Sequence, residues 1–218
     1  MAEISDSYGG KVVGGDIVRS ETFFISVAIV GAPIDTLVMR RDKATYGDLV
    51  AVSGHLGCSA AGLRIIKENL SFPSATEKHF TKSHFRPLPR IELGLSLARQ
   101  GIKCAMDVSD GLLNDLSKIC TASNVSATVS VSDLPVHEKL QSCFPNIWDQ
   151  LAVGGGEDYE LLFTIPRNLK DKISQHSGVE FKIIGEITEG SGGVTITGPT
   201  GESVDYSTGG WDHFREHA

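Results

Sequence analysis

A turn from strand to helix that carries two carboxylates constrains this chain more than any other feature. A short apolar strand is expected at 104–106 and a helix at 112–123, and Asp107-Val108-Ser109-Asp110-Gly111 joins them. Strands that alternate with helices through Gly-rich connections favour an α/β or α+β fold over an all-α or all-β class. Carboxylates this close together repel each other unless a cation lies between them, and Mg²⁺ is the usual candidate.

Capping of the helix is the simpler explanation of this turn, because Ser and Asp before a helix accept hydrogen bonds from its free N–H groups. One such residue would satisfy that need. Asp107, Ser109 and Asp110 together, followed by a glycine that lets a ligand approach the backbone, exceed it. We therefore favour a metal or nucleotide role, and a helix N-terminus also suits phosphates.

A second acidic stretch follows a triple glycine, and a buried strand expected at 161–165 comes directly after it. Its acids are Glu157, Asp158 and Glu160. A solvated surface loop is the alternative, but such loops seldom run straight into Leu-Leu-Phe. Together the two stretches make magnesium-dependent phosphate chemistry the first hypothesis.

Composition narrows the class of protein. The 218 residues carry a formal charge of −7 and no Lys/Arg run longer than two, which argues against nucleic-acid binding. No apolar run reaches the ~18 residues of a membrane span, and the start does not resemble a signal peptide. The four cysteines form no CxxC pair, so a reduced, cytoplasmic setting is expected. Neither a P-loop nor a GxGxxG fingerprint occurs.

Hydrophobic periodicity predicts the remaining elements. Residues 1–7 are expected to be irregular, 69–89 to be a polar, proline-punctuated linker, and 187–218 to hold one hairpin and a tail. Asn124 is a plausible helix stop, and the helix at 137–150 should be interrupted near Pro145. The other expected strands are 23–30, 49–53, 127–131 and 181–186, and the other expected helices are 59–68, 91–100 and 168–176.

Several other residues have a simple structural interpretation, and some of them also have a functional one. Gly14-Gly15-Asp16 suits an ordinary hairpin turn. Arg40 and Arg41 suit a solvated pair and a phosphate clamp equally well. Trp211 follows two glycines, so its ring is either a stray exposed aromatic or a platform for a heteroaromatic ligand. His55 lies between glycines and is interpreted as structural, and His79 and His84, in the expected linker, have no metal-ligand partners at useful spacing.

The chain resembles the superfamily of aminoimidazole ribonucleotide synthetase and selenophosphate synthetase, and within it the thiamine-monophosphate kinase family. The resemblance extends from Gly9 almost to the end, and it rests on the order and spacing of the motifs. They are Gly14-Gly15-Asp16, Val38-Met39-Arg40-Arg41, Tyr46-Gly47-Asp48, Gly54-His55-Leu56-Gly57, Ser59-Ala60-Ala61-Gly62-Leu63, Arg86-Pro87 to Pro89-Arg90, Asp107 to Leu112, Gly154 to Phe163, and Gly210-Trp211-Asp212-His213-Phe214.

The resemblance implies a kinase that transfers the γ-phosphoryl group of ATP to thiamine monophosphate and forms thiamine diphosphate. It assigns no enzyme nucleophile, because phosphoryl transfer depends mainly on positioning and charge neutralisation. By this resemblance, the ligands of Mg²⁺ would be Asp16, Asp107 and Asp110. ATP would be contacted by Gly15, Asp16, Arg40 and Ser109. Thiamine would be contacted by Glu157 and Trp211.

The resemblance also implies the domain organisation. Residues 36–218 would form the C-terminal domain, a mixed sheet covered by helices, and 1–35 would be the last strands of an N-terminal domain whose remainder is missing. The intact protein would be a cytoplasmic homodimer, and this shortened chain is expected to have little activity alone. A non-catalytic fragment or binding module, and a sibling ATP-dependent ligase, are the alternatives.

Overall fold

The computed structural model describes residues 2–33, 37–176 and 180–206, apart from the side chains of 174–176. The chain divides into two compact units, residues 1–32 and residues 33–218. In the first unit, a short helix α1 (Ala2–Ser7) precedes a segment that forms neither helix nor strand as far as residue 33. The second unit contains all the described strands, and the candidate site is built there. No helix in the described ranges is long and apolar enough to cross a bilayer.

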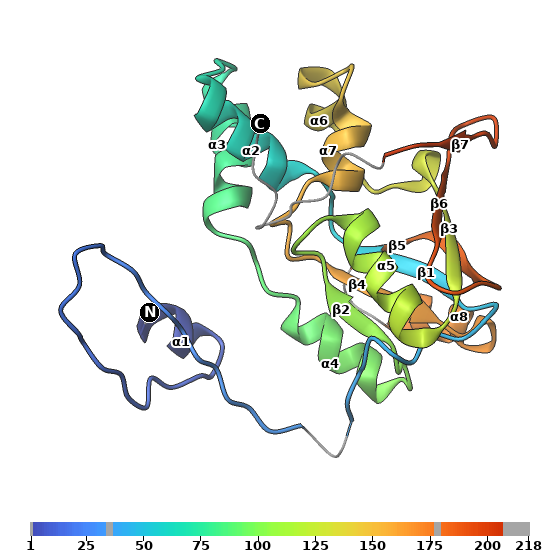
Figure 1. Cartoon of the computed structure of the whole chain (residues 1–218), viewed down its shortest axis with the longest axis horizontal. Helices are drawn as coiled ribbons and strands as arrows, with labels where there is room; N and C mark the ends of the chain where they lie inside the picture. The colour runs from blue at the N-terminus through green and yellow to red at the C-terminus, as the bar shows by residue number, and fades with distance from the viewer. Residues whose placement is uncertain (1, 34–36, 177–179, 207–218) are drawn as a thin grey trace. The chain divides into compact units, whose positions relative to one another are not determined.

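One seven-stranded mixed sheet organises the second unit (Figure 1). Its strand order is β2-β4-β1-β5-β3-β6-β7, and every neighbouring pair is antiparallel except β3 with β6. The strands are β1 (Leu49–Ser53), β2 (Ala105–Asp107), β3 (Ser126–Ser130), β4 (Leu161–Ile165), β5 (Phe181–Thr188), β6 (Val194–Thr197) and β7 (Ser203–Val204).

Helices cover both faces of this sheet, and alternation along β1 shows how. Val50 and Val52 pack into one hydrophobic cluster together with residues of α5 (Leu112–Ser123) and α7 (Trp148–Gly154). Leu49 and Ala51 pack into a second cluster with residues of α4 (Ile91–Arg99) and α8 (Lys170–His176). Successive strand side chains point to opposite faces, so a strand buried on both faces must be apolar throughout. The expected mixed sheet covered by helices is confirmed.

A third hydrophobic cluster joins helices α2 (Cys58–Glu68), α3 (Ser74–Phe85) and α6 (Glu138–Cys143). The contact between α2 and α3 is very close, because a Cβ placed on Gly62 would lie 2.2 Å from the carbonyl oxygen of Phe80. His84 Nδ1 lies 3.0 Å from Ser59 Oγ across the same interface. The candidate site contacts this helical layer at the first residues of α2.

Three expectations from the sequence are wrong. The segment expected to be a linker at 69–89 contains α3, a helix whose buried side chains are only Thr76 and Phe80. With so few apolar positions its periodicity is too weak to be recognised, and packing against α2 stabilises it instead. In the first unit, residues 23–30 form no strand, and residues 2–7 are helical rather than irregular. A strand needs a partner for its N–H and C=O groups, and none of the described strands pairs with this segment.

Most other boundaries agree with the periodicity. The interruption expected near Pro145 separates α6 from α7, and two 3₁₀ turns, at Val131–Asp133 and Arg167–Leu169, fill short connections. Asn124 ends α5 in the left-handed conformation with φ 54°, as its role of helix stop requires. The last two strands, β6 and β7, form the expected hairpin.

The register of β3 against β5 can be tested at Gly185. Its added Cβ would lie 2.0 Å from the carbonyl oxygen of Thr128, so Gly185→Ala should lower the free energy of unfolding by about 1–3 kcal/mol. Gly94 on α4 is the matched control, because its added Cβ meets only Met39 at 3.8 Å. Gly94→Ala should raise stability by up to ~1 kcal/mol. Urea unfolding of both variants measures this, and equal stability of Gly185→Ala and wild type would contradict the register.

Candidate functional site

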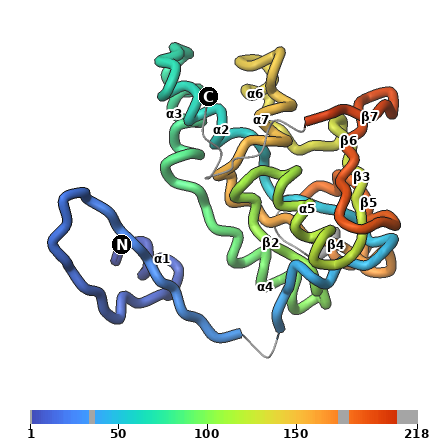
Figure 2. The backbone as a smooth tube through the Cα atoms, viewed as in Figure 1, coloured from blue at the N-terminus to red at the C-terminus, as the bar shows by residue number. Residues whose placement is uncertain are grey.

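The two acidic stretches lie side by side, although a long sequence separates them (Figure 2). Beyond the paired strands β2 and β4, Val108 N–H donates to the carbonyl of Glu160 at 2.9 Å, and Tyr159 N–H donates to the carbonyl of Val108 at 2.9 Å. Glu157 N–H donates to the carbonyl of Ser109 at 2.8 Å. We call these three backbone hydrogen bonds the clasp. The clasp makes one site out of the two stretches.

The glycines of both stretches are required for this close approach. A Cβ on Gly156 would lie 2.6 Å from the carbonyl oxygen of Ser109. One on Gly111 would lie 2.8 Å from the carbonyl oxygen of Gly154, and Gly111 also has φ 104°. No side chain fits in either place without a shift of the backbone. The glycines next to the acids therefore serve the contact between the two loops.

The acidic loop after the triple glycine has an unusual backbone. Glu157 and Tyr159 both have left-handed φ angles, 67° and 51°. For residues with a Cβ this conformation costs about 1–2 kcal/mol each, and it persists only where the surroundings fix the chain. The clasp fixes both residues through their N–H groups. Glu157 remains exposed, whereas its neighbours Asp158 and Glu160 are held by polar partners.

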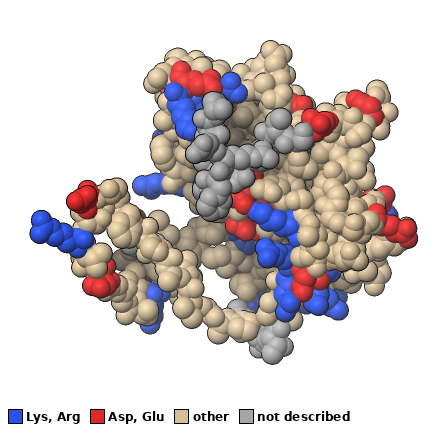
Figure 3. All heavy atoms as spheres, in the orientation of Figure 1, with Lys and Arg blue, Asp and Glu red and all other residues tan. Residues whose placement is uncertain are grey.

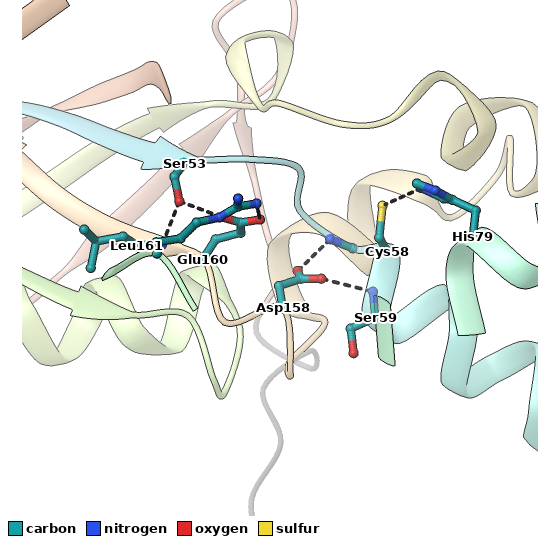
Figure 4. A network of polar contacts seen from close by, with 9 residues as sticks. Ser53, Cys58, Ser59, His79, Asp158, Glu160 and Leu161 are labelled. Carbon is teal, nitrogen blue, oxygen red and sulfur yellow. Dashed lines mark hydrogen bonds and ion pairs between the residues drawn. The ribbon is translucent and has the colours of Figure 1, made fainter. Parts of the chain in front are cut away.

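Asp158 caps the beginning of α2 from a distance (Figure 4). Its Oδ2 accepts the N–H of Gly57 at 2.7 Å, and its Oδ1 accepts the N–H of Ser59 at 3.0 Å. The helix has no side-chain cap of its own, so Asp158 supplies the missing acceptor. Burial raises the pKa of Asp158 to about 7, against the effect of the two N–H donors, and the charge of Glu160 raises it further.

The buried carboxylate of Glu160 forms an ion pair with Arg90, a half-buried residue that lies just before α4. Arg90 Nε donates to Oε2 at 2.6 Å and Nη2 donates to Oε1 at 2.5 Å. The hydroxyl of Ser53, at the end of β1, also donates to Oε2 at 2.6 Å and accepts the N–H of Leu161 at 2.9 Å (Figure 4). Glu160 thus connects the start of β4 to β1 and to the start of α4.

Asp115 holds the first acidic loop from inside α5. Its side chain is fully buried, and its Oδ2 accepts the N–H groups of Ser109 at 2.8 Å and Asp110 at 2.9 Å. Its Oδ1 accepts the ammonium of Lys118 at 2.7 Å. Lys118 also donates to Oδ2 of Asp110. A buried carboxylate and one lysine therefore fix the loop before any ligand binds.

The electrostatics of the site are negative around Tyr159. Burial raises the pKa of its phenol. The charge of Glu157 and a hydrogen bond to that carboxylate raise it further, and so do the charges of Asp107 and Asp110. Its phenol is therefore within electrostatic reach of carboxylates from both stretches. On the face drawn in Figure 3, blue side chains gather in the lower part of the second unit, and red side chains lie beside them. A phosphate ligand would need a cation to approach these carboxylates.

Comparisons with known proteins agree with this architecture. The sequence model of "AIR synthase related protein, C-terminal domain" matches residues 45–197. Thiamine-monophosphate kinase of Bacillus subtilis is 31% identical over 221 residues, which are 99% of this chain and 68% of the relative. The chain belongs to the thiamine-monophosphate kinase family. Thiamine-monophosphate kinase of Haemophilus influenzae is 36% identical over 217 residues, which are 96% of this chain and 65% of the relative.

Solved structures give the same result for the fold. AaThiL complexed with AMPPCP and TMP superposes with a TM-score of 0.69 at 31% identity, covering 81% of this chain and 54% of that chain. The family and the fold class expected from the sequence are therefore confirmed. The chain spans about two thirds of the length of curated kinases such as that of H. influenzae, and about half of the solved relative.

The clasp brings together four of the residues that the resemblance to this kinase family implicates. Asp107 and Glu157 are exposed, and Ser109 and Asp110 are half-buried. Arg40 does not contact these four residues through its side chain. Its guanidinium forms two hydrogen bonds with the carboxylate of Asp42, at 2.7 and 2.8 Å, and this exposed ion pair lowers the pKa of Asp42 to about 2. Gly15 and Asp16 belong to the first unit, and Trp211 lies outside the described residues.

The donors that the site offers suit the magnesium expected for the kinase family. No group of three or more His, Cys, Asp or Glu in the described ranges is arranged to hold a metal ion. Mg²⁺ usually keeps several waters and uses only one or two carboxylates together with substrate phosphates. The loop between β2 and α5 carries two carboxylates, Asp107 and Asp110, which is the number that such an ion requires. The ammonium of Lys118 already bonds Asp110, so a cation is accommodated at this carboxylate.

Sequence reasoning missed the residues that support the site. They form no motif by spacing, because their partners come from distant segments. Asp158 and Glu160 were visible as acids of the second stretch, and Asp115 as an acid in the first turn of an expected helix. An acid inside an apolar helix face was the available signal. The supporting residues are Ser53, Arg90, Asp115, Lys118, Asp158 and Glu160.

The ion pair of Glu160 should contribute strongly to stability. Glu160→Gln leaves the guanidinium of Arg90 without its charged partner, so we expect the free energy of unfolding to fall by about 2–4 kcal/mol. Glu186→Gln, in the exposed pair with Arg167, is the matched control and should change it by less than ~1 kcal/mol. Urea denaturation compares the two variants. Equal losses of unfolding free energy in the two variants would show that the Glu160 ion pair is no more stabilising than the exposed Glu186 pair.

The raised pKa of Asp158 predicts a pH effect on stability. The folded pKa of about 7 exceeds the ordinary unfolded value of about 3.9, so the folded state binds the proton more tightly. The resulting stabilisation is full below pH ~4 and is lost as the pH rises through ~7. Asp158→Asn should remove this fall between pH ~4 and ~7. Urea midpoints measured at each pH test it, and parallel profiles for variant and wild type would refute it.

Proposed function

We propose that the protein transfers the γ-phosphoryl group of ATP to the phosphate of thiamine monophosphate, with Mg²⁺ as the required metal, and forms thiamine diphosphate. The observation that supports the proposal is the clasp, which joins the loop of Asp107 and Asp110 to Glu157 in a chain of this kinase family. The related AaThiL is complexed with AMPPCP, an analogue of ATP, and with TMP.

The ATP side of the site is assigned to the first acidic stretch. Asp107 and Asp110, with Asp16, are the proposed ligands of Mg²⁺, which when bound would neutralise phosphate charge. Ser109 lies between the two carboxylates, and the helix α5 begins just after them, so its N-terminal end favours an anion. The remaining proposed ATP contacts are Gly15, Asp16 and Arg40.

The thiamine side is assigned to the second stretch. Glu157 is exposed, and its left-handed backbone is fixed by the clasp, so its carboxylate is available to a cationic or amino-bearing ring. Trp211 is the proposed stacking partner of that ring. The two assignments support each other because the clasp joins Glu157 directly to Ser109.

Catalysis in this arrangement needs no enzyme nucleophile. The phosphate of thiamine monophosphate attacks the γ-phosphorus of ATP in line, and the protein contributes positioning and charge neutralisation. The supporting carboxylates Asp115, Asp158 and Glu160 keep the loops fixed, so little reorganisation is required when substrates bind.

The assembly of the whole protein completes the proposal. Residues 1–35 are assigned to an N-terminal ATP-binding and dimerisation domain and residues 36–218 to the C-terminal domain. The protein would act as a homodimer in the cytoplasm. Size-exclusion chromatography with light scattering measures the mass, and a monomeric full-length protein would contradict the dimer.

A substrate panel tests the activity. The full-length protein with Mg²⁺ and ATP should convert thiamine monophosphate to thiamine diphosphate, measured by chromatography of the thiamine esters, and should leave the substrates of sibling ATP-dependent ligases unchanged. Failure to phosphorylate thiamine monophosphate or a close analogue would refute the proposed function. Turnover of a ligase substrate instead would reassign the protein within the superfamily.

The metal role of Asp107 has its own test. Asp107→Asn removes one charged ligand, so Mg²⁺-dependent turnover should fall by about a hundredfold, comparable to loss of one stabilising group in other active sites. Asp171→Asn, on the exposed face of α8, is the matched control and should leave turnover unchanged. Rates are measured across magnesium concentrations. Unchanged kinetics for Asp107→Asn would indicate that Asp107 has no role beyond the turn.

A further inference from the structure

Lys118 connects two carboxylates of different kinds. Its Nζ donates to Oδ2 of Asp110, on the loop before α5, and to Oδ1 of Asp115, three residues earlier on the same helix. The side chain of Asp110 is 35% exposed, whereas that of Asp115 is fully buried. One ammonium group thus serves an accessible carboxylate and an inaccessible one.

The carboxylate of Asp115 cannot move without breaking the hydrogen bonds that hold the loop before α5. Both of its oxygens are used: Oδ2 accepts the N–H groups of Ser109 and Asp110, and Oδ1 accepts Lys118. A buried carboxylate without a cation would be strongly destabilising. The bond from Lys118 to Asp115 is therefore structural.

Asp110 differs, because solvent reaches it and a second cation can replace the lysine there. Lysine carries a compact charge on a flexible stem, so its ammonium can release one carboxylate while it keeps the other. Without any cation, Asp110 would face the charges of Asp115 and Asp107 unscreened. The bond from Lys118 to Asp110 is therefore exchangeable.

We propose that Lys118 is a built-in counter-ion of the metal site, which holds Asp110 when no divalent cation is bound and yields that carboxylate, while staying on Asp115, when one binds. This inference rests on the proposed role of Asp110 as a metal ligand. Lys118 is a positioning residue that acts through Asp110. Its competition lowers the affinity of the site for a free divalent cation and so favours a cation that arrives with a polyphosphate.

Metal binding without nucleotide tests the proposal. Mn²⁺ is the probe, and the free ion is measured by electron paramagnetic resonance during titration of the protein. Lys118→Met should bind Mn²⁺ about two- to fivefold more tightly than wild type, the value of a partly exposed ion pair. Lys78→Met, on the exposed face of α3, removes the same charge elsewhere and should leave the affinity unchanged.

A double-mutant cycle with Asp110→Asn isolates the interaction. Asp110→Asn should weaken Mn²⁺ binding, and in that background Lys118→Met should no longer tighten it. Lys118→Gln provides a second variant, because its amide can still donate to Asp115 while the charge is gone. Circular dichroism verifies the fold of each protein, and Lys118→Gln replaces Lys118→Met if the latter unfolds.

The outcomes separate this inference from the proposed function. Unchanged or weaker Mn²⁺ binding by both Lys118 variants would overturn the role of Lys118 alone. Equal binding by wild type and Asp110→Asn would overturn it by removing Asp110 from the metal ligands, whatever the substrate of the enzyme. Failure of the thiamine monophosphate assay, with the expected Mn²⁺ results, would leave the counter-ion in place and refute only the reaction.

Discussion

The clasp between the two acidic loops is the interaction on which the candidate site depends. Three backbone hydrogen bonds extend the pairing of β2 and β4 beyond the ends of the strands, so loops from distant parts of the chain behave as one element. The sheet places them next to each other because its two covered faces fix the position of β4. Glycines without side chains then allow the final approach. If these hydrogen bonds were lost, Glu157 would no longer be held beside the Asp107 loop.

Carboxylates that accept several hydrogen bonds give the clasp its rigidity. Asp115, Asp158 and Glu160 each accept several donors, and each joins a loop to a neighbouring helix or strand. Asp115 and Glu160 are buried and each is paired with a cation; since a buried charge is stable only when it is paired and hydrogen-bonded, these two residues can hardly adopt another arrangement. The carboxylates of Asp107 and Glu157 are exposed instead. The site thus separates acids that hold the structure from acids that face solvent.

Sequence reasoning predicted the elements whose periodicity is strong and failed where stability comes from partners. The strands at β1 and β4 and the helices α4 and α5 were expected because apolar residues repeat clearly along them. Helix α3 was missed because its stability depends on close packing against α2 at Gly62. The strand expected at 23–30 has the right composition, but the described residues provide no strand to pair with it.

The sequence alone determined the class of fold, the family and the residue types of the site, because strand-to-helix turns, glycines and clustered acids are local patterns. Only the tertiary structure decided how the acids divide their roles. Asp158 and Glu157 are neighbours in the chain, yet one caps a helix and the other faces solvent. Likewise Asp115 is a buried support, although it is only five residues from Asp110. The physical reason is that burial and hydrogen-bond partners come from segments distant in sequence, and these set the charge and freedom of each carboxylate.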